Sequence, residues 1–113
     1  GTGKPLREFL HVDDLVSACV FLMNNLEASD LYGEGISHIN VGSGDEVTIK
    51  ELALTIKEII GYKGELVFNG DYPDGMPRKL LDVSRLNKMG WESKISLDQG
   101  LKSTYDWFKQ NVA

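Results

Sequence analysis

The sequence predicts an α/β fold in which helices flank a small sheet with at least some parallel pairing. Short apolar runs alternate along the chain with segments whose apolar residues recur at helical spacing, and such alternation is typical of βαβ units. Two Ser/Thr-x-x-Glu/Gln sequences stand directly before helical segments, which marks helix starts by an independent signal. The predicted order is strand, helix, strand, helix, strand, loop, helix, helix.

The first half of the chain opens with a loop and a strand that leads into a helix. Its predicted elements are a loop at residues 1–5, a strand at 7–12, a helix at 14–25, a polar connection at 27–35 and a strand at 36–41. The apolar residues of the helix recur at helical spacing, which predicts one buried face. Cys19 lies within that face, so we expect a small buried side chain rather than a reactive thiol.

Gly42-Ser43-Gly44 follows the second predicted strand and resembles the start of a dinucleotide-binding loop. The third glycine of that motif would fall at position 47, where the chain has Val47. We therefore interpret the two glycines as a tight turn, and we predict no cofactor-binding residue in this chain.

The second half contains the best-marked helices. Thr48 with Glu51, and Ser96 with Gln99, form capping boxes, and Gly61 is placed to end the first of these helices. The predicted elements are a helix from residue 48 to 60, a strand at 65–69, a loop at 70–79, a helix at 84–89 and a helix that begins after residue 96.

Composition limits the classes of function. Twelve Lys and Arg stand against 17 Asp and Glu, a net charge of −5, whereas nucleic-acid-binding proteins usually carry a positive field. No apolar run approaches the roughly 20 residues of a membrane span. The single cysteine excludes an internal disulfide and a multi-cysteine zinc site. We therefore expect a cytoplasmic protein without nucleic acid, membrane or metal.

Arg7 and the Arg78-Lys79 pair are candidate ligands for a phosphate-bearing molecule. Arg7 lies in the first predicted strand, and the pair follows a loop that two prolines and a glycine restrict to few backbone conformations. Cations from separate segments could clamp a diphosphate, while Asp74 in that loop could accept a hydrogen bond from a sugar hydroxyl. A solvated surface charge is the alternative for each residue taken alone.

The other polar side chains of interest have structural interpretations. Asp13 and Asp14 stand at a predicted helix start, where carboxylates cap free N–H groups and oppose the helix dipole. His11 and His38 each lie in an apolar strand context, so a structural histidine is favoured over a ligand or a proton carrier.

Several segments resemble a known family. Residues 5–14 (PLREFLHVDD) resemble a segment of the extended short-chain dehydrogenase/reductases that act on nucleotide sugars. Residues 37–44 (SHINVGSG) and 73–82 (PDGMPRKLLD) are more specific, and together with Gly90-Trp91 and residues 103–108 they resemble the GDP-L-fucose synthase family. The resemblance runs over the whole chain and corresponds to the C-terminal third of that family.

The resemblance implies a reaction and a set of substrate contacts. Enzymes of the family use NADPH to convert GDP-4-keto-6-deoxy-D-mannose into GDP-L-fucose, by epimerisation at C3 and C5 and reduction at C4. By this resemblance Arg7 contacts the nucleotide diphosphate, Asp74 and Lys79 belong to the GDP-sugar site, and Arg78 is adjacent. A cytoplasmic homodimer is the implied form of the parent enzyme.

The resemblance also implies that the chemistry lies elsewhere. The family's NADP loop, its Ser, Tyr and Lys catalytic set, and the Cys and His of epimerisation all lie upstream of Gly1, and Cys19 and His11 match neither of the latter two. Residues 1–113 are therefore expected to be a C-terminal, sugar-nucleotide-binding portion of a longer polypeptide, with no catalytic residue. Its partner would be the NADP-binding Rossmann part, and the isolated chain should be inactive.

Two alternatives remain open. The chain could be the same part of another NAD(P)-dependent nucleotide-sugar epimerase or dehydratase, or a stand-alone nucleotide-sugar-binding module without chemistry. Tight binding of GDP by the isolated chain would favour the module, because a portion of a larger enzyme lacks the groups on the facing half of the site.

Overall fold

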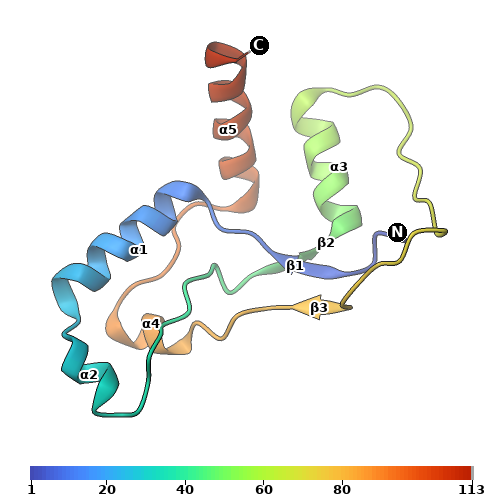
Figure 1. Ribbon diagram of the computed structural model, residues 1–113. Coiled ribbons are helices and arrows are strands. Elements are labelled where there is room, and N and C mark those ends of the chain that lie inside the picture. The colour runs from blue at the N-terminus through green and yellow to red at the C-terminus, as the bar shows by residue number, and fades with distance from the viewer. Residues whose placement is uncertain (113) are drawn as a thin grey trace.

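The computed structural model describes residues 1–112, in which eight elements follow one another from β1 to α5 (Figure 1). They are β1 Leu6–Glu8, α1 Val12–Asn25, α2 Ala28–Tyr32, β2 Glu46–Thr48, α3 Ile49–Ile60, β3 Arg78–Lys79, α4 Ser84–Met89 and α5 Leu97–Asn111.

The sheet has three short strands in the order β2-β1-β3. The central strand β1 pairs antiparallel with β2, with Arg7 opposite Val47, and parallel with β3, with Arg7 opposite Lys79. The predicted α/β class with some parallel pairing is therefore confirmed.

Two of the three predicted strands are wrong in position. Residues 36–41 and 65–69 form no strand, whereas β2 and β3 come from residues that the sequence assigned to a helix cap and a loop. Ile39 and Val41 instead pack against the core as irregular chain. The first strand is also shorter than predicted, and the polar connection at 27–35 contains α2, which a capping box between Glu27 and Asp30 starts.

The helices after residue 48 are confirmed. Both predicted capping boxes are present, at Thr48 for α3 and at Ser96 for α5. Gly61 ends α3 with φ 71° and Gly90 ends α4 with φ 106°. Both angles lie in the left-handed region, which glycine enters without steric cost.

The start of α1 differs from the prediction. Its N-cap is His11, whose Nδ1 accepts a hydrogen bond from the Asp13 N–H at 3.2 Å. The other ring nitrogen, Nε2, lies 3.2 Å from the Ser103 hydroxyl of α5. His11 therefore has the structural role that the sequence suggested, although as a helix cap rather than as a strand residue.

Asp14 joins α1 to the segment before α5. Its carboxylate, only 4% exposed, accepts hydrogen bonds from the backbone N–H groups of Lys94 at 3.1 Å and Ile95 at 2.9 Å. A buried carboxylate needs such partners. Asp14 therefore has a structural role, but it connects two segments of the fold instead of capping α1.

The core lies between α1 and α4. Ala18, Leu86 and Trp91 are buried together, and the Trp91 indole N–H donates to the Ser17 hydroxyl at 2.8 Å. The buried face of α1 thus runs along Asp14 and Ala18. Cys19 is exposed, so the prediction that it is buried is wrong.

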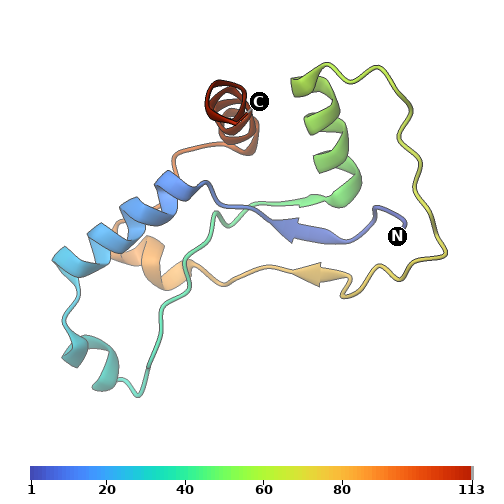
Figure 2. The same ribbon diagram turned by 45° about the horizontal axis from the view of Figure 1, so that its top comes forward.

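The described chain is open rather than compact. Its radius of gyration is 17.4 Å, against about 13 Å for a compact domain of this length, and its accessible surface is 8219 Å², against about 6,200 Å². Figures 1 and 2 show α2 and α4 at one end of the molecule, away from the α3–α5 pair, while α1 runs from the lower end of α5 toward α2. Large apolar side chains of α1 are uncovered, among them Val16, Val20 and Met23.

Within residues 1–112, every helix is too short or too polar to cross a membrane.

Replacing Asp14 by alanine should lower the free energy of unfolding by about 1–3 kcal/mol, because two backbone donors lose their acceptor. Asp13→Ala is the matched control: the exposed Asp13 carboxylate lies 3.7 Å from His11 Nδ1 and has a helix-dipole effect of about 0.3–1 kcal/mol. Urea unfolding of the three proteins measures both changes. Equal losses in the two variants would remove the bridging role from Asp14.

Candidate phosphate-binding site

The parallel pairing of β1 with β3 brings two of the predicted site residues together. Arg7 and Lys79 are partners in the β1–β3 register, although 71 other residues separate them in sequence. Partners in register project to the same face of a sheet. The sequence therefore identified two cations that the fold places side by side.

The Arg7 guanidinium is held close to the loop that precedes β3. Its Nη1 donates to the Leu6 carbonyl at 2.7 Å. A Cβ atom built on Gly75 would lie 4.0 Å from Arg7 Nη2, and Gly75 has φ 73°. The glycine thus lets the loop backbone turn beside the guanidinium, whose remaining N–H groups suit the oxygens of a phosphate.

Arg78 lies on the other face of the sheet. It is in register with Leu6, and its Nε is 2.8 Å from the Glu46 carboxylate of β2. The ion pair spans β1 and connects the two edge strands. The fold therefore separates Arg78 from the Arg7–Lys79 pair, and its predicted place in the substrate site has no support from this geometry.

Asp74 is already engaged within the chain. Its two carboxylate oxygens accept hydrogen bonds from the hydroxyl and the backbone N–H of Thr2, which tie the loop to the N-terminal segment. The Thr2 hydroxyl and then its N–H lower the pKa of Asp74. Each carboxylate oxygen can accept a second hydrogen bond, so the predicted contact with a sugar hydroxyl is compatible with these two bonds.

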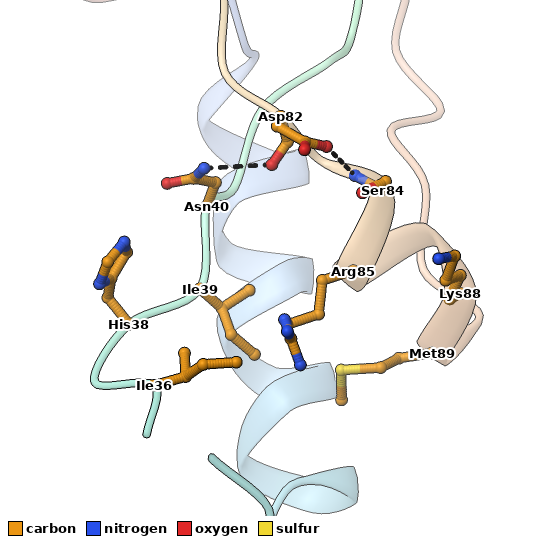
Figure 3. Close-up of a pocket in the computed structure, with 9 residues that line it drawn as sticks. All are labelled: Ile36, His38, Ile39, Asn40, Asp82, Ser84, Arg85, Lys88 and Met89. Atoms are coloured by element: carbon orange, nitrogen blue, oxygen red, sulfur yellow. Dashed lines mark hydrogen bonds between the residues drawn. The ribbon is translucent and has the colours of Figure 1, made fainter. Parts of the chain in front are cut away.

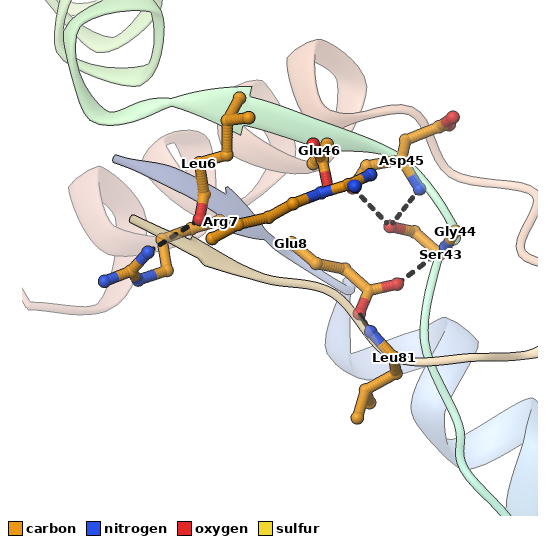
Figure 4. Close-up of polar contacts among 9 residues, drawn as sticks. Leu6, Arg7, Glu8, Ser43, Gly44, Asp45, Glu46 and Leu81 are labelled. Atoms are coloured by element: carbon orange, nitrogen blue, oxygen red, sulfur yellow. Dashed lines mark hydrogen bonds and ion pairs between the residues drawn. The ribbon is translucent and has the colours of Figure 1, made fainter. Parts of the chain in front are cut away.

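Glu8 is a residue beside the candidate site whose contacts sequence reasoning missed. It follows Arg7 in β1, and its carboxylate accepts from the Gly44 N–H at 2.6 Å and from the Leu81 N–H at 3.3 Å. Figure 4 shows the Arg7 and Glu8 side chains leaving β1 in different directions. The available signal was weak: a carboxylate next to Arg7, ahead of the apolar residues Phe9 and Leu10.

The Gly42-Ser43-Gly44 segment does not fit the phosphates of a dinucleotide. A Cβ atom on Gly42 would lie 2.8 Å from the Glu8 carboxyl carbon, and the Gly44 N–H is donated to the same carboxylate. A pyrophosphate at this turn would face a negative charge instead of free N–H groups. The interpretation of this segment as a structural turn agrees with the structure.

A pocket of about 550 Å³ lies away from these residues, between α4 and the segment that carries His38 (Figure 3). Asp82 lies on its wall. Its backbone carbonyl accepts a hydrogen bond from the Asn40 side chain at 3.1 Å, and its carboxylate accepts one from the Ser84 N–H at 3.0 Å. Arg85 is paired with Glu34 of the segment after α2 at 2.8 Å. None of the predicted site residues lines this pocket, and His38 is exposed beside it. No cluster of three or more potential metal-binding side chains occurs in residues 1–112.

Solved structures define the class of protein to which this fold corresponds. A GDP-6-OMe-4-keto-L-xylo-heptose reductase from C. jejuni matches with a TM-score of 0.90 and 44% identity, over 97% of this chain and 32% of that chain. A GDP-L-fucose synthetase from Naegleria fowleri matches with a TM-score of 0.86 and 27% identity, over 98% of this chain and 32% of that chain. The chain has the fold of a part of the extended short-chain dehydrogenase/reductases that act on nucleotide sugars.

Sequence relatives are more specific. Residues 1–42 match the NAD dependent epimerase/dehydratase family. The chain is 59% identical over 99% of its length to the putative GDP-L-fucose synthase 2 of Arabidopsis thaliana, and 52% identical over 98% to the GDP-L-fucose synthase of Escherichia coli K12. The resemblance to GDP-L-fucose synthases that the sequence motifs indicated is confirmed. The chain spans 32% and 35% of the lengths of these two relatives.

Replacing Thr2 by valine should move the pKa of Asp74 part of the way back to the ordinary aspartate value of about 3.9, because the hydroxyl donor is lost and the N–H remains. A lowered pKa in the folded state contributes stability above the ordinary pKa, and this stability is lost as the pH falls through the lowered value. The NMR titration of the Asp74 carboxyl carbon measures the shift. Asp82, whose pKa Ser84 lowers, is the internal control. An unchanged Asp74 titration would contradict the Thr2 contact.

Proposed function

We propose that this chain is the GDP-sugar-binding part of an NADPH-dependent enzyme. The enzyme epimerises GDP-4-keto-6-deoxy-D-mannose at C3 and C5 and reduces C4, which gives GDP-L-fucose. The similarity to proteins named GDP-L-fucose synthase, over nearly all of the chain, supports this proposal. Because the chain spans about a third of their length, the activity is proposed for the complete enzyme.

The observation that carries the proposal is the pairing of Arg7 with Lys79 across the parallel strands. Two cations on one sheet face, supplied by segments far apart in sequence, can each donate charged hydrogen bonds to one group of a diphosphate. The arginine fork binds two oxygens in a plane, while the lysine acts as a mobile point charge. This arrangement suits the diphosphate of a nucleotide sugar.

The part played by this chain is binding and orientation. NADPH would supply the hydride for reduction at C4, and structural neighbours include a C. jejuni GDP-mannoheptose C4 reductase with NADP bound. The Gly42-Ser43-Gly44 turn does not fit that cofactor, so we assign the cofactor and the catalytic residues to the rest of the enzyme. Arg7 and Lys79 would hold the diphosphate, with Asp74 beside it, so that the sugar reaches those residues in one orientation.

A second candidate is the same part of an enzyme for another GDP-sugar. The 44% identity and TM-score of 0.90 to the C. jejuni heptose reductase favour it. The proposed diphosphate contacts would be the same, since both substrates carry GDP.

We further propose, on the family resemblance, that the complete enzyme is a cytoplasmic homodimer.

A hybrid enzyme tests the proposed function. In this hybrid, the present chain replaces the matching segment of the Escherichia coli GDP-L-fucose synthase, to which it is 52% identical. With NADPH and GDP-4-keto-6-deoxy-D-mannose, the hybrid should form GDP-L-fucose, while the isolated chain should not exceed the blank. A folded hybrid that reduces only a GDP-heptose would favour the second candidate. Turnover by the isolated chain would contradict the proposal.

Within the hybrid, Arg7→Ala and Lys79→Ala should each raise the KM for the GDP-sugar, because each removes a charged hydrogen bond of about 1.5–3 kcal/mol. Arg85→Ala is the matched control, since Arg85 is paired with Glu34, away from the sheet. Its effect should stay within about 0.5 kcal/mol. Steady-state kinetics measure all three. A KM that rises with Arg85→Ala and not with the other two would place the diphosphate in the pocket beside His38.

A further inference from the structure

We propose that Glu8 is a positioning residue that holds Lys79 beside Arg7, so that diphosphate binding depends on a carboxylate that does not touch the ligand. The inference rests on the proposed function, because it concerns the same pair of cations. It adds a residue that the sequence motifs did not mark as functional.

Strand β3 needs an additional support because it is only two residues long, Arg78–Lys79, and both residues are exposed. It is held by its register with Leu6 and Arg7 and, just before the strand, by the Leu6 N–H donating to the Pro77 carbonyl at 2.9 Å. Such a short strand has little cohesion of its own. The position of Lys79 therefore depends on what holds the chain beyond the strand.

Glu8 holds the chain on the C-terminal side of β3. Its carboxylate accepts from the Leu81 N–H, two residues after Lys79, and from the Gly44 N–H on the segment that leads to β2. One side chain of the central strand thus fixes the segments that flank both edge strands (Figure 4). A carboxylate has only acceptors and can serve both donors, whereas a glutamine amide has one acceptor and would direct an NH2 group at one of the N–H groups.

Glu8 itself is turned away from the proposed ligand. Successive side chains of a strand project to opposite faces, so Glu8 shares the face of Arg78 and Glu46, opposite to Arg7. Gly42 makes room for the carboxylate there, since a Cβ atom at that position would contact it.

Glu8→Gln separates positioning from simple electrostatics because the two predict opposite signs. Removing a negative charge near two cations should strengthen anion binding by Coulomb attraction. Loss of positioning should weaken it. We expect the GDP dissociation constant of the hybrid enzyme to rise by about fivefold, since a misaligned charged hydrogen bond loses much of its strength. Amide chemical shifts in a GDP titration measure the constant even when binding is weak.

A double-mutant cycle with Lys79→Ala tests the route of the effect. If Glu8 acts through Lys79, Glu8→Gln should have little effect on GDP binding once Lys79 is alanine. Guanosine, which carries no phosphate, should bind Glu8→Gln and the unchanged hybrid equally. Glu34→Gln is the matched control, because that glutamate is paired with Arg85, away from the sheet, and its removal should leave GDP binding unchanged.

Three results would overturn the positioning role: tighter GDP binding by Glu8→Gln, equal weakening of guanosine, or a full effect in the Lys79→Ala background. If Glu8→Gln does not fold, Gly42→Ala displaces the same carboxylate from the other side. It then replaces Glu8→Gln in the double-mutant cycle with Lys79→Ala. Should Arg7→Ala and Lys79→Ala both leave GDP binding unchanged, the diphosphate clamp itself fails, and this outcome is distinct from a failure of Glu8 alone.

Discussion

The contact on which the candidate site depends is the parallel pairing of β1 with β3. Each strand is short, and β3 has two residues, so the ladder hydrogen bonds alone give little stability. Two side-chain bridges reinforce it: the Arg78–Glu46 ion pair connects the edge strands across β1, and Glu8 binds the segments on both sides. Both bridges lie on one face, which leaves the other face to Arg7 and Lys79.

This division of the sheet explains how a chain with a net charge of −5 can present a cationic site. The acidic side chains of β1 and β2 are used by backbone donors and by Arg78, so they do not face the proposed diphosphate. The Asp74 carboxylate is likewise bound within the chain, because it accepts hydrogen bonds from Thr2 and so ties the loop beside Arg7 to the N-terminal segment. The open shape of the chain, with much apolar surface uncovered, agrees with a structure that spans 32% of the length of its relatives.

Helices were the part of the fold that the sequence predicted well, because capping boxes and terminal glycines are local signals. Thr48, Ser96 and Gly61 act as expected. The strands were misplaced because pairing is decided by distant residues: an apolar run such as 36–41 has strand propensity but no partner, while Arg78-Lys79 has a partner and little propensity.

The candidate site could be predicted in part for a similar reason. Arg7 and Lys79 stood out by charge and by the stiff loop, and the fold brings them together. Arg78 pairs with Glu46 because of the strand register, and Asp74 is bound by Thr2 through a contact between residues far apart in sequence. Neither can be read from a local sequence pattern. Glu8 was missed because its two donors, on Gly44 and Leu81, lie far away in sequence.

A crystal structure of the hybrid enzyme with GDP would test the central claim most directly, since it locates the diphosphate relative to the sheet. The account predicts nitrogen atoms of both Arg7 and Lys79 within about 2.7–3.2 Å of phosphate oxygens, with Arg78 still paired with Glu46 and Glu8 still bound to Gly44 and Leu81. A diphosphate bound on the Arg78 face, or in the pocket beside His38, would contradict it.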